Sequence, residues 1–509
     1  MTVHLSILLF WPLAVAVVGG LLPRGLAGAV AVLAALVPLV LAVIVLIDFD
    51  ASKAGLHYVT DDAWIPDLGI RYKLGLDGLN LWLVGLTALL FAATALWTVF
   101  RPPARSPKLY VFHLGLAETA VLGAFLAQDL ALFVLFFDLM LVPFYFLVGV
   151  WGGPDRVAAT FKLVVYTLVG SLLMLAAAVA TAVLSSQEGG GHPLSFVLSD
   201  LTRISLPEST QKWIFVAFAL AFLIKMPAFP VHGWMPDGYR NMPLPVLVLF
   251  SGVLSKVAAY GFLRVVMPLF PQAVADFQEI VLLIALASIL YGSALAFTQT
   301  NARLILGYSS MAQLGFITLG IFALDGASQG GQGAVLQMVN HGLVVAPLFF
   351  IVALLAERAQ GSDDIREMGG IAFRAPVLAT LFMIAALATL AMPGSSNFIG
   401  EFFILIGLFN TKIVYSIVAF TGVAMASVYM LRMFIRTMHN RLVPGAESRD
   451  LSLRDAAVIA PLVLCVLALA VYPQQAMTDS ERSVKASLAK GQRAAGTEST
   501  IAAVGRAAP

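Results

Sequence analysis

Residues 222–236 read FLIKMPAFPVHGWMP, and residues 388–401 read ATLAMPGSSNFIGE. In both stretches a Met-Pro pair lies in the middle of an apolar run and is followed by residues that do not favour a regular helix. Proline removes a backbone donor and clashes with the preceding turn, so the freed carbonyls need water or a polar partner. Both stretches therefore predict a transmembrane helix that is interrupted near its middle.

The chain as a whole has the composition of a membrane protein. It has 509 residues, of which 60% are hydrophobic and 11% are charged, and its mean hydropathy is +0.93. Soluble domains are about half apolar and about a quarter charged, so a soluble fold is excluded. Apolar runs of about 20 residues recur, and no segment alternates as the strands of a β-barrel do. We expect an all-α integral membrane protein of about fourteen transmembrane helices. The expected spans are residues 4–22, 26–47, 79–100, 109–128, 130–150, 160–184, 213–236, 243–266, 277–297, 302–322, 333–356, 376–409, 413–436 and 454–472.

Several other classes of protein are disfavoured. The net charge is only +2, and no basic patch with interleaved aromatic residues indicates a nucleic-acid partner. The single cysteine, Cys465, can form no internal disulfide and leaves no cysteine cluster for zinc or iron–sulfur groups. The apolar run at residues 5–22 lacks a charged n-region and a cleavage site, which favours a retained first helix over a signal peptide.

The loop charges predict an orientation in the membrane. Odd-numbered loops hold roughly fifteen Lys and Arg residues and even-numbered loops roughly six, so the positive-inside rule places both termini outside. We expect a multi-pass protein of the cell (inner) membrane. The tail after Pro473 is polar and rich in Ala and Gly, and we expect it to be mobile.

The two interrupted spans predict an internal repeat. Interrupted helices at matching positions in two halves indicate a transport site between inverted repeats. We expect two inverted five-helix repeats, at residues 109–266 (spans four to eight) and 277–436 (spans nine to thirteen). Residues 1–108 would form N-terminal helices with an outside loop, and residues 437–509 a last helix with the polar tail. The alternative is that the prolines only kink two unrelated helices.

Ionisable residues at the middle of the spans indicate the function. Each costs about 2.5–3.5 kcal/mol at mid-membrane, and several together exceed a typical net stability of about 5–15 kcal/mol. They must face the interior of the bundle, where a carboxylate beside a lysine controls how readily the lysine holds its proton. This pattern predicts proton translocation. The residues are Glu118, Asp138, Lys225, Lys256, His341 and Glu401.

Structural roles are alternatives for several of these residues. Lys225 and Asp138 could form an ion pair that only stabilises the bundle. His341 could be a core histidine bonded to a carbonyl, although its near-neutral reference pKa suits a relay. Glu118 could brace a helix contact. His232 and Trp234 fit a role in shaping the break better than a role in proton transfer.

With these motifs the chain resembles the antiporter-like membrane subunits of respiratory complex I, the proton-pumping NADH:quinone oxidoreductase. The resemblance covers almost the whole chain and is most specific over residues 109–410. The stretches that carry it are FFDLMLVP (136–143), KMPAFPVHGWMP (225–236), LSKVAAYGFLR (254–264), YSS (308–310) and MPGSSNFIGE (392–401).

The resemblance implies roles for individual residues. It implies that Asp138 pairs with Lys225 and that Lys256 and His341 continue the relay. The terminal residue is a glutamate in the M type of subunit and usually a lysine in the L and N types, so Glu401 favours M. The resemblance further implies L-type and N-type neighbours and no cofactor in this subunit. NADH, FMN, iron–sulfur clusters and quinone would belong to partner subunits, in keeping with the absence of a G-x-G-x-x-G fingerprint.

Two positions depart from the family's pattern. Asp138 stands where the family usually has glutamate, and Gln313 stands where it often has histidine. Gln313 cannot titrate but can bond a water. Mrp-type sodium/proton antiporters and membrane-bound hydrogenases share the implied fold and are alternative functions. A passive scaffold would leave the buried charges unexplained.

Overall fold

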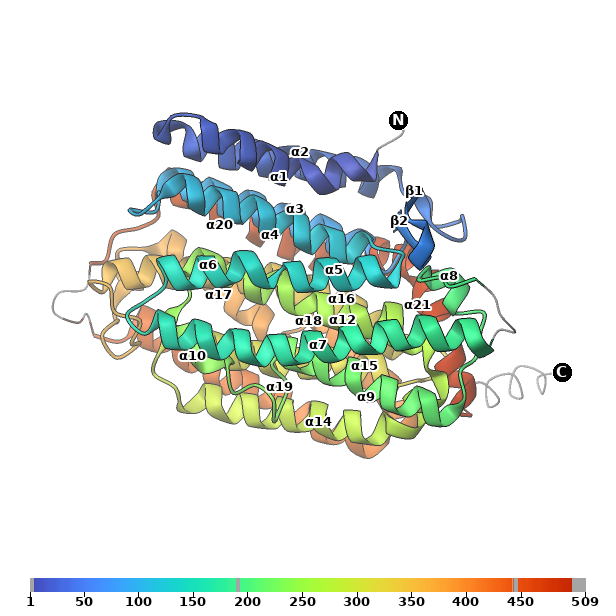
Figure 1. Ribbon diagram of the computed structural model, residues 1–509. Coiled ribbons are helices and arrows are strands. Elements are labelled where there is room, and N and C mark those ends of the chain that lie inside the picture. The colour runs from blue at the N-terminus through green and yellow to red at the C-terminus, as the bar shows by residue number, and fades with distance from the viewer. Residues whose placement is uncertain (1–3, 189–192, 442, 444–446, 497–509) are drawn as a thin grey trace.

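The protein is a bundle of long helices that run side by side (Figure 1). The structure, a computed structural model, describes residues 4–188, 193–441, 443 and 447–496. Within these residues eleven helices are long and apolar enough to cross a membrane, and three shorter apolar helices accompany them. The three shorter helices are Leu5–Leu21 and the two halves of the interrupted twelfth span, so these helices and the interrupted seventh span account for the expected spans. This confirms a mostly helical, multi-pass membrane protein.

The elements of the first half follow the expected spans closely. They are α1 (Leu5–Leu21), α2 (Ala27–Asp48), α3 (Leu81–Phe100), α4 (Pro107–Leu126), α5 (Leu130–Leu139), α6 (Leu141–Trp151), α7 (Arg156–Glu188), the short α8 (Leu198–Leu201), α9 (Glu208–Lys225), α10 (Met235–Asn241), α11 (Leu244–Leu249), α12 (Ser255–Gly261) and α13 (Met267–Leu269).

The second half continues in the same way. Its elements are α14 (Pro271–Thr298), α15 (Ala302–Phe322), α16 (Gln329–Arg358), α17 (Pro376–Thr389), α18 (Ser396–Thr411), α19 (Ile413–Phe434), α20 (Leu453–Val471) and α21 (Gln474–Ala494).

Burial separates central helices from peripheral ones. The most apolar windows of α15, α16 and the span Leu244–Leu269 are entirely buried, whereas those of α7 and α19 are 39% and 33% buried. The peripheral helices expose large apolar side chains such as Phe161 and Phe420, which match the lipid tails around them. The polar residues of α12, α15 and α16 are therefore held away from lipid.

The loop between α2 and α3 contains the first departure from expectation. Residues His57–Ile65 (β1) and Ile70–Leu76 (β2) form an antiparallel hairpin beside the bundle end (Figure 1), so the expectation of a purely helical chain was wrong here. The carboxylate of Asp129 accepts a hydrogen bond from the backbone N–H of Arg71 at 3.0 Å. Most of β1 is exposed, whereas β2 is half-buried to buried, and neither strand shows a clear apolar alternation in the sequence.

The C-terminal tail is the second departure. Over residues 474–494 it is not mobile but forms α21, which lies across the same end of the bundle (Figure 1). Val484 and Leu488 are fully buried one turn apart, and the side chain of Gln492 donates to the carbonyl of Asp325 at 2.6 Å. A narrow apolar stripe in a polar helix is enough to dock it on the bundle. Residues 497–509 lie outside the described residues.

Both expected helix interruptions are present. The seventh span stops with α9 at Lys225 and resumes with α10 at Met235, and the twelfth stops with α17 at Thr389 and resumes with α18 at Ser396. Two further irregularities were not predicted. The fifth span breaks between α5 and α6 at Met140, and π-helical segments at Phe250–Leu254 and Phe262–Val266 flank α12 in the eighth span.

Candidate functional site

Lys225 is the last residue of α9 and ends the first half of the interrupted helix. Its side chain is 4% exposed. The ammonium Nζ donates to the backbone carbonyl of Phe137 at 2.9 Å and lies 4.0 Å from the centre of the Phe137 ring. A desolvated ammonium over an aromatic face gains a cation–π attraction. The helix break thus leaves Lys225 held by α5.

Asp138 follows Phe137 on α5 but does not bond Lys225 directly. Among the described residues no ion pair within 4.0 Å joins the two, and the carboxylate lies beside the hydroxyl of Ser171 on α7. The charges remain within electrostatic reach of each other. The pairing implied by the resemblance is therefore a through-space one, with the Phe137 carbonyl as the contact atom.

Lys256 and His341 form the closest contact between two of the expected residues. The Nζ of Lys256 on α12 lies 2.6 Å from Nδ1 of His341 on α16, and the two residues are 0% and 3% exposed. Lys256 also donates to the carbonyl of Ser251, which lies in the π-helical segment before α12. Like charges repel strongly in a buried site, so the pair favours one positive charge over two. Such a pair can pass a proton between its members.

Glu401 is joined to α16 through two glutamines. The Nε2 of Gln313 donates to the carboxylate of Glu401 at 2.8 Å, and the Nε2 of Gln337 donates to Oε1 of Gln313 at 2.7 Å. Gln337 precedes His341 by one helical turn, so both lie on the same face of α16. Gln313, which stands where the family often has a histidine, thus bridges Gln337 and Glu401 by hydrogen bonds. Sequence reasoning missed Gln337, although its spacing from His341 was a usable signal.

Further polar groups surround the second break. The amide nitrogen of Asn340 donates to the carbonyl of Ser396 at 2.7 Å. Asn397 is fully buried, and neither of its amide atoms has a partner among the described residues. Unmatched buried polar groups are rare in proteins and mark hydrophilic interiors. The start of α18, one turn before Glu401, is such an interior.

Glu118 stands apart from the other expected residues. It lies on α4 with 1% exposure, and its Oε1 has no hydrogen-bond partner within the described part of the chain. The structure brings Lys256 to His341 and Glu401 to Gln313, but it brings no charged group to Glu118. A residue that braces two helices needs a bonding partner on the second helix. The interpretation of Glu118 as a structural brace therefore gains no support.

Two residues of the first break, Trp234 and His232, make contacts that hold the interrupted helix in shape. The indole Nε1 of Trp234, which is fully buried, donates to the carbonyl of Ile224 at 2.9 Å and so ties the break back to α9. His232 packs its ring against Phe229 and Tyr291. These contacts support a role in shaping the break.

Two interrupted helices, two buried lysines and a buried carboxylate inside one bundle define an antiporter-like membrane subunit. Residues 127–426 match the family model described as NADH:quinone oxidoreductase/Mrp antiporter, TM. The chain is 35% identical over 485 residues to NADH-quinone oxidoreductase subunit M of Rhodobacter capsulatus, covering 92% of this chain and 93% of that protein.

Solved structures agree with this match. A chain of respiratory complex I from Thermus thermophilus superposes with a TM-score of 0.86 and 29% identity, covering 97% of this chain and all of that one. A chain of the Mrp complex from Dietzia has a TM-score of 0.82 at 22% identity, covering 98% and 100%, which shows a shared fold only. The chain belongs to the NADH:quinone oxidoreductase/Mrp antiporter membrane-subunit family, and within it to the M type, as Glu401 indicated.

Proposed function

We propose that this chain is the proton-translocating M subunit of an NADH:quinone oxidoreductase. The observation that carries the proposal is the direct contact of Lys256 with His341, two fully desolvated bases 2.6 Å apart at the centre of the bundle. Burying two basic groups together costs free energy and adds no ion pair that would stabilise the fold, so a role in proton transfer explains the contact better than a structural one.

The order of the groups suggests the order of transfer. Asp138 sets the charge felt by Lys225, and Lys225 passes a proton to Lys256 across the centre of the bundle. Lys256 passes it to Nδ1 of His341, and the imidazole can release a proton from its other nitrogen. Gln337 and Gln313 then lead to Glu401, the last titratable group before the outside. We also assign a proton-carrying role to Glu118, a buried carboxylate of α4 that lies apart from these contacts.

We assign the two interrupted spans to inverted five-helix repeats, residues 109–266 and 277–436. Residues 1–108 and 437–509 flank them. The matching positions of Lys225 and Glu401, each beside a break, support this division. The even number of expected spans and the loop charges support an orientation with both termini outside.

Electrons would travel in other subunits. NADH, FMN, iron–sulfur clusters and quinone are assigned to partners, and the neighbours in the membrane to L-type and N-type subunits. The Mrp-type antiporter is the second candidate, because its fold is shared. Co-purification separates the two: flavin and iron–sulfur subunits support the oxidoreductase, and only multispan partners support the antiporter.

Substitution of Lys256 tests the proton-carrying role. Lys256→Met in the assembled complex should reduce proton pumping by roughly 10²-fold or more, the scale of a positioned acid–base group. Tyr110→Phe, which alters a buried hydroxyl beside Thr98 at the far end of the bundle, serves as the control. Normal pumping by assembled Lys256→Met would refute the proposal.

A further inference from the structure

A line of polar side chains follows Lys256 toward the end of the bundle where α21 lies. Tyr260 and Arg264 follow Lys256 at intervals of four residues and continue its helix face. The Tyr260 hydroxyl donates to the carbonyl of Phe125 at 2.9 Å and accepts from Nε of Arg264 at 2.8 Å. A terminal nitrogen of Arg264 lies 2.5 Å from the carboxylate of Asp77.

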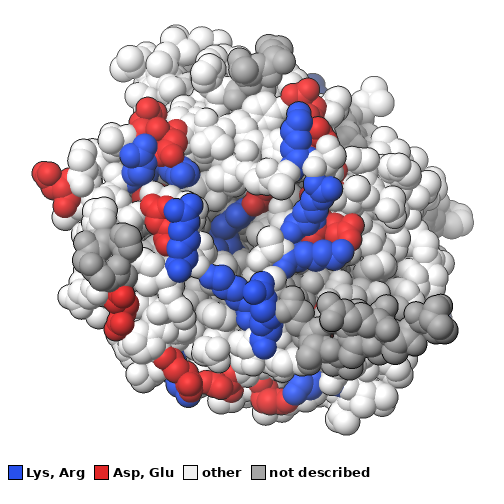
Figure 2. Space-filling model, turned by 90° about the vertical axis from the view of Figure 1, so that its right-hand side faces the viewer, with Lys and Arg blue, Asp and Glu red and all other residues white. Residues whose placement is uncertain are grey.

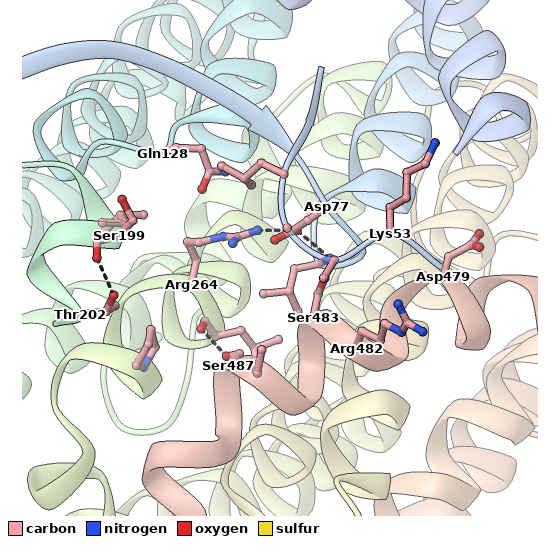
Figure 3. A pocket seen from close by; sticks show the side chains of 18 of the residues that line it. Lys53, Asp77, Gln128, Ser199, Thr202, Arg264, Asp479, Arg482, Ser483 and Ser487 are labelled. Carbon is pink, nitrogen blue, oxygen red and sulfur yellow. Dashed lines mark hydrogen bonds and ion pairs between the residues drawn. The ribbon is translucent and has the colours of Figure 1, made fainter. Parts of the chain in front are cut away.

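This line of polar side chains opens into a surface pocket. Asp77 and Arg264 line a cavity of about 350 Å³ together with Gln128, Asp479 and Arg482. Figure 3 shows the guanidinium of Arg264 pointing at Asp77 inside this pocket. Figure 2 shows the same end of the molecule, where Lys and Arg side chains surround a hollow. Three bonded side chains thus lead from the turn after Lys256 to the surface.

Helix α21 holds the two backbones that carry the ion pair. The hydroxyl of Ser483 accepts from the backbone N–H of Gly78, next to Asp77, at 3.1 Å. The hydroxyl of Ser487 donates to the carbonyl of Leu263, next to Arg264, at 2.5 Å. Arg264 itself lies in the π-helical segment Phe262–Val266, and such segments recur at functional sites. The ion pair is therefore braced from both sides.

We propose that Tyr260 is an outward proton exit from Lys256, closed by Arg264, which its ion pair with Asp77 holds beside the Tyr260 hydroxyl. This inference rests on the proposed function. In the closed state Arg264 occupies the outward side of the Tyr260 hydroxyl. When Arg264 leaves the hydroxyl while remaining on Asp77, a proton released by Lys256 passes through water to the freed lone pair of the Tyr260 hydroxyl. The hydroxyl releases its own proton to water in the pocket, so Tyr260 ends neutral and Asp77 stays ionised.

The test compares variants of the assembled complex in proteoliposomes. Tyr260→Phe removes only the hydroxyl and should slow pumping by about tenfold or more, since a positioned proton carrier contributes roughly 10²–10⁴ to a transfer rate. Tyr110→Phe is the matched control. If Lys256→Met is slow but Tyr260→Phe pumps normally, the exit is overturned and the proposed function stands. If assembled Lys256→Met also pumps normally, the proposed function is refuted, and the exit from Lys256 is refuted with it.

A second variant tests the gate without relying on turnover. Asp77→Asn/Arg264→Gln removes both charges together, so that neither is left unpaired. With an imposed pH gradient and no NADH, we expect passive proton leakage several-fold above that of the wild type. Leakage should return to the wild-type rate when Tyr260→Phe is added. A double variant as tight as the wild type would overturn the gate.

Discussion

The ammonium of Lys225 donates to the backbone carbonyl of Phe137 at 2.9 Å, although the carboxylate of Asp138 is the next residue along. The last carbonyls of a helix lack their usual intrahelical partners, and α5 ends two residues after Phe137. The break at Met140 thus supplies an acceptor for Lys225 without neutralising its charge. Asp138 can then modulate the lysine from a distance instead of trapping it in a tight ion pair.

This arrangement predicts how Asp138 variants behave. Asp138→Asn should lose most pumping because the lysine loses its counter-charge, while Asp138→Glu should keep most of it, the reference pKa values being about 3.9 and 4.3. The longer glutamate reaches about 1.3 Å further, and its overpacking costs about 1–3 kcal/mol, which is seen as lower yield. Proton uptake by reconstituted complex measures both variants.

Asp129→Asn is the matched control for these variants. Asp129 caps α5 through the backbone N–H groups of Ala131 and Leu132, and asparagine caps a helix about as well as aspartate. Its pumping should stay at the wild-type rate. Normal pumping by Asp138→Asn would make Asp138 dispensable and would turn attention to Glu118.

The bridge at Glu401 predicts a graded series. Glu401→Gln should block release of the proton that reaches Glu401 and so lower pumping, because an amide cannot titrate, and Glu401→Asp should retain part of this release. Losing one partner of a buried charged network costs about 3–5 kcal/mol in unfavourable cases, so assembly is measured first. Stopped-flow dye measurements on assembled complex then report release. Equal rates for Glu401→Gln and the wild type would remove Glu401 from the pathway.

The orientation predicts a labelling pattern in intact cells. After Cys465→Ala removes the native thiol, a membrane-impermeant reagent should label Ala54→Cys, which lies exposed before the hairpin. It should not label Glu367→Cys, which is exposed at the opposite end. Labelling of Glu367→Cys alone would reverse the orientation while leaving the fold intact.

The docking of α21 predicts a stability effect. Leu488 is fully buried and its side chain lies against Gly331, so Leu488→Ala should weaken docking by about 2–5 kcal/mol. Limited proteolysis of the purified complex should then cleave residues 474–494 faster. Lys485→Ala alters an exposed side chain of the same helix and should leave cleavage unchanged, within about 0.5 kcal/mol. Equal protection of Leu488→Ala would mean that the polar bonds of α21 suffice.

Much of this protein could be predicted from its sequence alone. Spans of about 20 apolar residues are forced on a chain that must satisfy its backbone in lipid, so their positions followed from composition. Proline chemistry located both interruptions, after Lys225 and before Ser396. The cost of charge in lipid singled out Lys256, His341 and Glu401, and Glu401 also indicated the M type of subunit.

Only the tertiary structure decided which of these groups touch. The contact of Lys256 with His341, the Gln337–Gln313–Glu401 bridge and the free carbonyl at Phe137 each join residues on different helices. Their proximity depends on how the helices pack and on where π-helical turns shift the helix register. Neither feature produces a periodic pattern of residues that can be recognised in the sequence. The hairpin and the polar helix α21 were not predicted for a related reason: both gain their stability from docking on the end of the bundle, and not from their own composition.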